Sequence, residues 1–152
     1  MPEDIIYFYT TGDDYGCFSN FSRHGFGLKD KYWKTSEHYF QAMKFEGTDH
    51  EDAVREAITP KEAAKRGRDR SRPLRKDWEQ VKDDIMREAV LAKFETHDDI
   101  RQILLDTGDA PLVENAPGDY YWGCGRDGSG KNMLGIILEE TREILRKRGA
   151  GE

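Results

Sequence analysis

The sequence predicts a mainly α-helical protein, folded as one compact multihelical domain over residues 1–152 with a few short β-strands. Three observations support this prediction. Apolar side chains recur at helical spacing through most of the chain beyond residue 35, whereas β-branched and aromatic runs are short and few. A chain of 152 residues has the length of one domain. Its seven Phe, seven Tyr and three Trp supply enough large apolar side chains for a core.

The expected strands are short and lie mostly near the N-terminus. Residues 5–9 are β-branched and aromatic, and the turn sequence TGDD follows at residues 11–14. Residues 16–22 place small and polar residues between two Phe, which indicates an irregular loop or a short strand. Residues 26–33 are expected to form a second strand or one arm of a hairpin, and residues 111–113 a further brief strand.

Helices are expected in the remainder of the chain. Their predicted ranges are residues 36–45, 49–58, 60–67, 77–95, 96–107 and 131–148. The clearest start signal is Thr59-Pro60-Lys61-Glu62, which supplies an N-cap, a proline at the first helical position and a glutamate at the third. The same helix should end at Gly67. The last helix is expected to face the core with Leu134, Ile137, Leu138, Ile144 and Leu145.

Composition excludes several classes of protein. No apolar run approaches the roughly 18 residues that a membrane helix needs. Residues 1–4 also lack the basic and apolar flank of a secretory signal, so we expect a cytoplasmic protein without membrane contact. Two cysteines, Cys17 and Cys124, are too few for a disulfide scaffold or a cysteine-based zinc site. The four histidines have no metal-ligand spacing, so we expect no metal site. No other cofactor is expected.

The formal net charge of −6 argues against nonspecific binding to duplex nucleic acid. This charge is unevenly distributed, because eight basic residues oppose two acidic ones between residues 61 and 76. The basic residues are Lys61, Lys65, Arg66, Arg68, Arg70, Arg72, Arg75 and Lys76. Such a segment can receive a phosphate or diphosphate, although a solvated helix face and loop explain the same pattern.

A glycine-rich stretch at residues 123–132 resembles two nucleotide-binding patterns without fulfilling either. The phosphate loop of NTPases requires Ser or Thr after its Lys, but Asn132 follows Lys131. Only 20 residues remain after Asn132, too few for the parallel sheet of such a fold. The dinucleotide fingerprint likewise lacks its βαβ unit. We therefore expect a flexible loop that meets a helix N-terminus, a place for an anion or for a close approach of the backbone.

One polar stripe stands out in the predicted helix at residues 36–45. Glu37, Gln41 and Lys44 occupy positions i, i+4 and i+7, so they share one face over two turns. Tyr39 and Phe40 flank this face. Two interpretations stay open: an exposed polar stripe with the aromatic rings facing the core, or a set of polar groups that line a site.

A second cluster is formed by Asp119-Tyr120-Tyr121-Trp122 ahead of Gly123. A carboxylate among aromatic rings beside a glycine-rich loop suits a pocket for a flat heterocycle joined to a sugar. A capped turn with aromatic packing explains the same residues equally well.

Several short segments carry a family resemblance when they are taken together. They are GCFSNF at 16–21, TSEHYFQA at 35–42 with KF at 44–45, GRDR at 67–70, RKDW at 75–78, DYYWG at 119–123 and GKNMLG at 130–135. In this order they resemble the NADAR (NAD- and ADP-ribose-associated) family, most closely its YbiA-like branch, over residues 5–146. The resemblance implies a compact, mostly helical domain with a few short strands, which agrees with the prediction above.

The resemblance also implies an activity, the cleavage of the C–N bond between ribose C1 and a nitrogenous base. In the YbiA-like branch the substrates are phosphoribosylamino-pyrimidine intermediates of riboflavin biosynthesis, which yield ribose 5-phosphate and a free aminopyrimidine. Other branches remove ADP-ribose from guanine, so nucleic acid is an expected partner only in ADP-ribosylated form. A third interpretation is a module that binds ADP-ribose or NAD without turnover.

The candidate site residues fall into two groups. The catalytic candidates are Glu37, Lys44 and Asp119, and the substrate-binding candidates are Asn20, Phe21, Arg68, Arg70, Trp78, Trp122 and Arg126. A carboxylate near C1 can stabilise the cationic transition state or activate water, and a protonated acid can serve the departing base. Alternatively, the Lys44 amine attacks C1 of a ring-opened ribose and forms a Schiff base. Which carboxylate is the acid and which the base stays open at this point.

Overall fold

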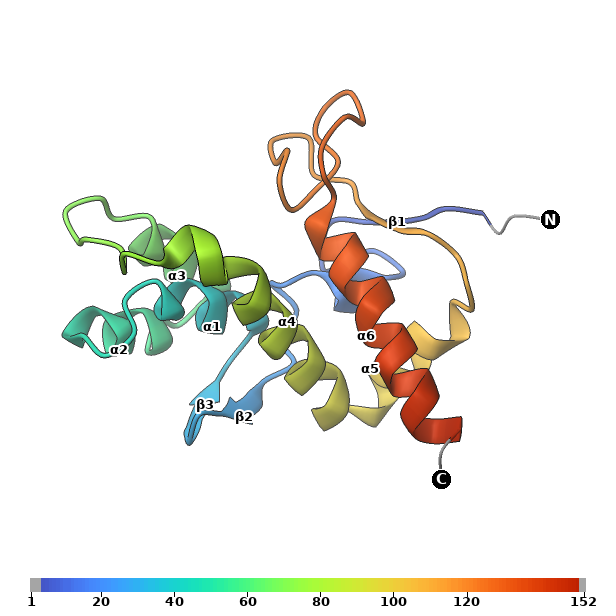
Figure 1. Cartoon of the computed structure of the whole chain (residues 1–152), viewed down its shortest axis with the longest axis horizontal. Helices are drawn as coiled ribbons and strands as arrows, with labels where there is room; N and C mark the ends of the chain where they lie inside the picture. Colours follow the sequence, from blue (N-terminus) through green and yellow to red (C-terminus); the bar gives the residue numbers. More distant parts are fainter. Residues whose placement is uncertain (1–3, 151–152) are drawn as a thin grey trace. The chain divides into compact units, whose positions relative to one another are not determined.

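The computed structural model describes residues 4–150 (Figure 1). The chain divides into two compact units. The terminal unit contains the residues up to Ser19 and from His97 onward, and the central unit contains Asn20–Thr96. Across the described residues there are six α-helices and four strands of three residues each, so the predicted mainly α-helical class is confirmed.

The central unit begins with an antiparallel hairpin. Its strands are β2 (Phe26–Leu28) and β3 (Lys31–Trp33), and Phe26 pairs with Trp33. The turn residues Lys29 and Asp30 have φ values of 55° and 62°. Two successive left-handed residues give the turn a twist that matches the two strands. The expected hairpin arm is therefore a complete hairpin.

Four helices complete the central unit. They are α1 (Ser36–Met43), α2 (Asp49–Arg55), α3 (Pro60–Gly67) and α4 (Trp78–Thr96). The side chain of Thr59 accepts a hydrogen bond from the backbone N–H of Glu62 at 3.1 Å, which confirms the predicted cap of α3. Helix α1 contacts α2, α3 and α4, and every residue from Ser36 to Met43 is buried. It is thus the central helix of this unit.

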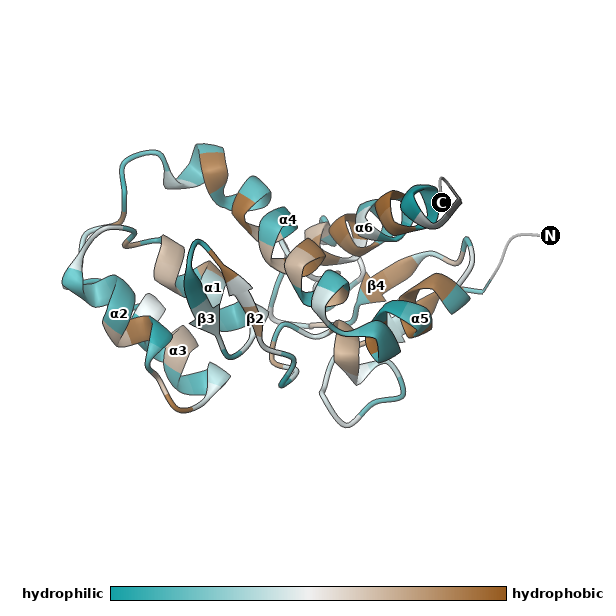
Figure 2. Ribbon diagram, turned by 90° about the horizontal axis from the view of Figure 1, so that it is seen from below, coloured by the Kyte–Doolittle hydropathy of each residue, from teal (hydrophilic) through white to brown (hydrophobic). Residues whose placement is uncertain are grey.

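The terminal unit contains a two-stranded parallel sheet. Strand β1 (Ile6–Phe8) pairs with β4 (Leu112–Glu114), and Ile6 lies opposite Leu112. Helix α6 (Met133–Ala150) packs against β4 and against α5 (Asp98–Asp106). Figure 2 shows apolar residues on β4 and along α6. The helix comes so close to the strand that a Cβ on Gly135 would lie 2.0 Å from the Leu112 carbonyl oxygen, so glycine is required there.

The last helix starts two residues later than predicted because Asn132 serves the sheet. Asn132 has a left-handed backbone, with φ of 54°. Its side chain accepts from the Glu114 N–H at 2.9 Å and donates to the Leu112 carbonyl at 2.9 Å. The amide thus bonds to the edge of β4 as a neighbouring strand would. This role also explains why Asn rather than Ser or Thr follows Lys131.

Three further expectations need correction. Residues Gly16–Phe18 form a short 3₁₀ helix rather than a loop or strand. Helix α2 ends at Arg55, before Ile58, which is 80% exposed. Ile144 was predicted to face the core but is 41% exposed, because the buried stripe of α6 continues through Thr141 and Leu145. No helix within residues 4–150 is long and apolar enough to cross a bilayer.

Candidate active site on helix α1

The polar stripe of α1 is buried. Glu37, Gln41 and Lys44 are only 7%, 3% and 8% exposed. The exposed-stripe interpretation is therefore wrong. Three polar or charged side chains inside the middle helix of a unit are costly to bury unless they bind one another or serve chemistry.

Glu37 is held from two directions. Its backbone N–H donates to the Asn20 carbonyl at 3.1 Å, and its Oε2 accepts from the Gln41 side-chain Nε2 at 2.7 Å. Asn20 is itself anchored, because its Oδ1 accepts from the Ser36 hydroxyl at 2.8 Å. Asn20 was predicted to bind substrate, and the structure gives it a role at the start of α1. The neighbouring Phe21 is 37% exposed.

Lys44 directly follows α1 and lies between two aromatic rings. Its Nζ is 5.8 Å from the ring centroid of Phe40 and 5.8 Å from that of Trp78. The two rings meet edge to face with centroids 5.1 Å apart. The Nζ lies 3.5 Å from the carbonyl oxygen of Gly67, the last residue of α3. The structure thus brings Lys44 and the predicted binding residue Trp78 together.

These surroundings change the protonation of Lys44. Burial of the ammonium lowers its pKa to about 8, from an ordinary 10.5. The positive charges of Arg70 and Arg68 act in the same direction, while the carboxylate of Glu37 opposes them. A lysine in such an environment has a substantial neutral fraction near neutral pH, and neutral amine is the nucleophilic form.

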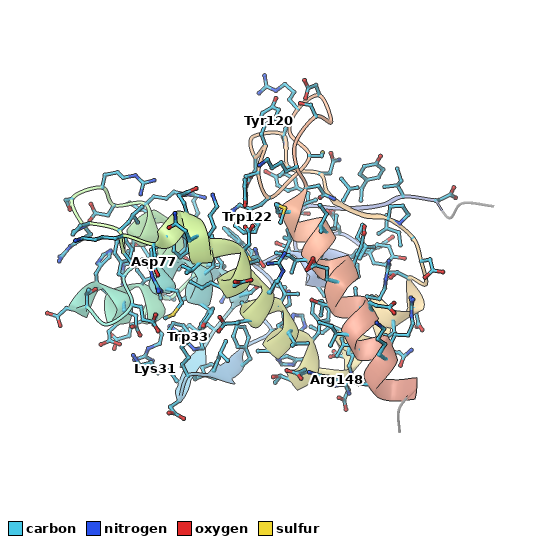
Figure 3. All side chains as sticks on the ribbon, viewed as in Figure 1. Lys31, Trp33, Asp77, Tyr120, Trp122 and Arg148 are labelled. Carbon is cyan, nitrogen blue, oxygen red and sulfur yellow. The ribbon has the colours of Figure 1, made fainter. Side chains whose placement is uncertain are left out.

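The segment between α3 and α4 carries the basic run close to Lys44. The Arg75 backbone N–H donates to the Lys44 carbonyl at 3.0 Å. Its guanidinium pairs with Glu46 at 2.9 Å and with Asp77 at 2.7 Å, directly before α4 (Figure 3). Arg75 therefore secures this segment, whereas Arg68 and Arg70 are exposed. These two residues keep their cationic groups available to an anion.

Asp119, Trp122 and Arg126 lie in the terminal unit, in the loop between β4 and α6. The Asp119 Oδ1 accepts from the backbone N–H groups of Tyr121 at 3.0 Å and Trp122 at 2.8 Å. The rings of Tyr121 and Trp122 meet edge to face, with centroids 4.9 Å apart. The capped turn that the sequence left open is thus present, and one carboxylate oxygen of Asp119 serves it.

The expected anion site at the start of α6 is not available. The backbone N–H of Met133 donates to the Tyr121 carbonyl and that of Leu134 to the Trp122 carbonyl, both at 3.0 Å. These are the groups that an anion at a helix N-terminus would need. Arg126 is exposed in the glycine-rich loop, beside Gly125 with a left-handed φ of 73°.

Comparison with known proteins agrees with these features. A family model described as the NADAR domain matches residues 7–146. This chain belongs to the NADAR family. An N-glycosidase from Nostoc punctiforme is 55% identical over 146 residues, which cover 93% of this chain and 92% of that protein. The N-glycosidase YbiA of Escherichia coli is 52% identical over 145 residues, 95% of this chain and 91% of YbiA.

The structural comparison supports the same family assignment. The NMR structure of E. coli YbiA has a TM-score of 0.92 and 49% identity, covering 100% of this chain and 90% of that one. A maize protein named riboflavin biosynthesis protein PYRR is 42% identical over 158 residues, 93% of this chain and 25% of its own length. Relatives of this similarity establish this NADAR protein as an enzyme, an N-glycosidase.

The contacts of two residues of the α1 site were not predicted from the sequence. Gln41 was recognised by its spacing, but its hydrogen bond to Glu37 was not foreseen. Gly67 was predicted as the end of a helix and as part of the GRDR segment, but its contacts with Gln41 and Lys44 were not foreseen. A glycine near the end of a predicted helix is an ordinary stop signal, so its packing role has no distinct signal in the sequence.

Proposed function

We propose that this NADAR protein hydrolyses the bond between ribose C1 and the amino nitrogen of phosphoribosylamino-pyrimidines, intermediates of riboflavin biosynthesis. The products are ribose 5-phosphate and a free aminopyrimidine. The bacterial relatives are named N-glycosidases, which supports the reaction, and the maize relative is named a riboflavin biosynthesis protein, which supports the pathway of the substrate. The single observation that carries the proposal is the burial of the Lys44 amine at the end of α1, two helical turns from the buried carboxylate of Glu37.

The proposed reaction proceeds through an imine on Lys44. The neutral amine forms a bond to C1, the ring C1–O bond opens, and the C1–N bond to the base breaks. One amine proton passes to the ring oxygen and the other to the departing amino group, so the base leaves as a neutral amine. Water then adds to C1 and releases Lys44, leaving the aldehyde of ribose 5-phosphate.

Glu37 is proposed to carry these protons. Its carboxylate lies one helical turn from Gln41 and two turns from Lys44, and its charge is felt at the amine. A carboxylate in that position can take a proton from the attacking amine and give it to the leaving nitrogen. Gln41 keeps one of its oxygens in a defined direction.

Substrate recognition is proposed for the remaining candidates. The Trp78 ring would hold the pyrimidine next to Lys44, and Arg68 and Arg70 would bind the 5-phosphate through their guanidinium groups. Asn20 and Phe21 are proposed to border the same site of the central unit. In the terminal unit, Asp119, Trp122 and Arg126 remain proposed site residues.

The lowered pKa of Lys44 predicts the pH dependence. Because only the neutral amine attacks, kcat/KM should rise about tenfold per pH unit up to about pH 8 and level off above it. The measurement is initial rate against pH in a constant-ionic-strength buffer. Arg70→Gln removes a positive charge that lowers this pKa, so its profile should shift to higher pH. A native profile that is flat through pH 8 would contradict a nucleophilic Lys44.

Asp119 can be tested for its charge apart from its turn. Asp119→Asn keeps an oxygen for the N–H groups of Tyr121 and Trp122, so the loop should survive. If the carboxylate acts on substrate, kcat should fall by about 10²-fold while the unfolding midpoint stays near the native value. Asp127→Asn is the matched control, because Asp127 Oδ1 accepts from the Ser129 N–H at 3.0 Å in the same loop. If Asp119→Asn keeps native activity, as the Asp127→Asn control should, Asp119 has no part in catalysis.

A second candidate substrate is ADP-ribose linked to guanine. A depression along α3 is lined by Lys61, Lys65 and Arg68 together with Thr59 and Glu62, and its three cations suit a second phosphate. Chromatography of products from the phosphoribosylamino-pyrimidine and from an ADP-ribosylated guanosine oligonucleotide, at equal concentrations, distinguishes the two. We expect faster release of aminopyrimidine. Release of ADP-ribose alone, with the unmodified oligonucleotide left behind, would favour the second candidate, and binding without any product would indicate a module without turnover.

A further inference from the structure

We propose that Gly67 is a positioning residue of the active site: its bare Cα seats the Gln41 amide, which in turn aims the Glu37 carboxylate. Gly67 ends α3 and Gln41 lies in α1, so the contact joins the two helices. The inference rests on the proposed function only where it assigns Glu37 a catalytic role. The geometry itself is independent of that role.

The approach of Gln41 to Gly67 leaves no space for a side chain. A Cβ on Gly67 would lie 2.1 Å from the Gln41 Oε1 and 2.7 Å from its Cβ and Cδ. The clash includes the Cβ of Gln41, so rotation of the end of that side chain would not relieve it. Any larger residue at position 67 therefore has to displace Gln41 or separate the helices.

The backbone of Gly67 does not require glycine. Its φ is not among the left-handed values, which occur at Gly47, Gly108, Gly125 and Gly128. Alanine forms helices better than glycine does. The local preference would therefore favour alanine, and the close contact with Gln41 is what glycine makes possible.

The orientation of the Gln41 amide follows from its two neighbours. The carboxylate of Glu37 accepts from Nε2 at 2.7 Å, so Oε1 must point the other way, toward Gly67. Oε1 is buried and has no hydrogen-bond partner within residues 4–150. A glycine Cα–H is a weak donor that tolerates such an oxygen. The amide is thus held in the one orientation that serves Glu37.

Gly67 also touches the second proposed catalytic group. Its carbonyl oxygen lies 3.5 Å from the Lys44 Nζ. One residue at the end of α3 therefore bears on both the carboxylate, through Gln41, and the amine, through its carbonyl. A neighbouring helix can thus hold the Glu37 carboxylate, in α1, and the Lys44 amine, at the C-cap of α1, in fixed positions relative to each other.

Gly67→Ala, Gln41→Gly and the double variant test the proposal. We expect Gly67→Ala to lower kcat roughly 10- to 100-fold with KM little changed, because the carboxylate is displaced while the binding groups stay. Gln41→Gly should lower kcat to a similar extent. The double variant should be no worse than Gln41→Gly, because removal of the whole glutamine side chain, its Cβ included, makes room for the methyl group. Losses that multiply in the double variant, or an undiminished Gly67→Ala, would overturn the proposal.

A matched control and a measurement that does not depend on enzyme activity distinguish the contact between Gly67 and Gln41 from the catalytic role of Glu37. Gly27→Ala adds the same methyl group in the same unit, where the nearest atom is 3.9 Å away, and should change nothing. The NMR signals of the Gln41 side-chain amide should shift in Gly67→Ala and stay in place in Gly27→Ala. If these signals shift but Glu37→Gln retains full turnover, the proposed function fails while the seat stands. If they do not shift, the seat itself is refuted. Should Gly67→Ala not fold, recovery of folding in the double variant supports the contact, and failure of both contradicts it.

Discussion

Replacing Glu37 with glutamine is expected to lower kcat by about 10²- to 10⁴-fold. The substitution removes the charge and the proton-carrying ability of the side chain but keeps its shape. The new amide oxygen can still accept from the Gln41 Nε2, and the backbone bond to Asn20 is untouched. The unfolding midpoint should therefore remain close to the native value. Initial rates and thermal unfolding of the same preparation measure both quantities.

Glu51→Gln is the control for this substitution. Glu51 is the other buried glutamate of the central unit, 5% exposed, with its carboxylate 2.5 Å from the Lys31 amine and 2.9 Å from the Gly47 N–H. Loss of its charge should weaken a structural ion pair, so the unfolding midpoint should fall while kcat is retained. Native turnover in Glu37→Gln would exclude the Glu37 carboxylate from the mechanism.

Replacing Lys44 with methionine is expected to abolish turnover and to stabilise the fold at neutral pH. The methionine keeps an unbranched chain between Phe40 and Trp78 but has no amine, so no imine can form. The gain in stability arises because the native protein buries an ammonium group, whose pKa is lowered to about 8 by that burial. We expect a gain on the order of 1 kcal/mol at pH 7, after the lost contacts of the amine are considered.

This gain should disappear as the pH rises. Well below pH 8 the lysine is mostly protonated in both states, and the folded state carries nearly the full penalty of the buried charge. Between about pH 8 and 10.5 the unfolded chain binds more protons than the folded one, so the native free energy of unfolding increases relative to that of Lys44→Met. Lys93→Met is the control: Lys93 is 1% exposed, with its Nζ 5.3 Å from the Phe94 ring centroid, and its loss should leave turnover intact. A Lys44→Met variant that is less stable than the native protein at pH 7 and still turns over substrate would contradict both expectations, the loss of turnover and the gain in stability.

Local signals predicted most of the helices and the order of the candidate residues. The caps at Thr35 and Thr59 bond to the third helical N–H, as such sequences usually do. The spacing of Glu37, Gln41 and Lys44 placed them on one face because helical periodicity alone determines that relation. The family resemblance then supplied the reaction class, which the relatives confirm.

Contacts between segments far apart in the chain could not be predicted from these local signals. An amphipathic helix and a buried helix with a polar stripe have the same periodicity, so only the packing of α2, α3 and α4 around α1 reveals that Glu37 and Lys44 are enclosed. The parallel pairing of Ile6 with Leu112 depends on two segments far apart in the chain. The occupied N-terminus of α6 depends likewise on carbonyl groups of Tyr121 and Trp122, which no sequence pattern announces.

Chemical trapping of the sugar on the enzyme examines the proposed nucleophile without recourse to rates. Borohydride added during turnover reduces an imine to a stable secondary amine, and peptide mass spectrometry locates the modified lysine. The account predicts a single ribose 5-phosphate adduct on Lys44, absent from Lys44→Met and from enzyme reduced without substrate. An active enzyme that yields no adduct, or an adduct on a different lysine, would show that the buried amine is not the group that attacks C1.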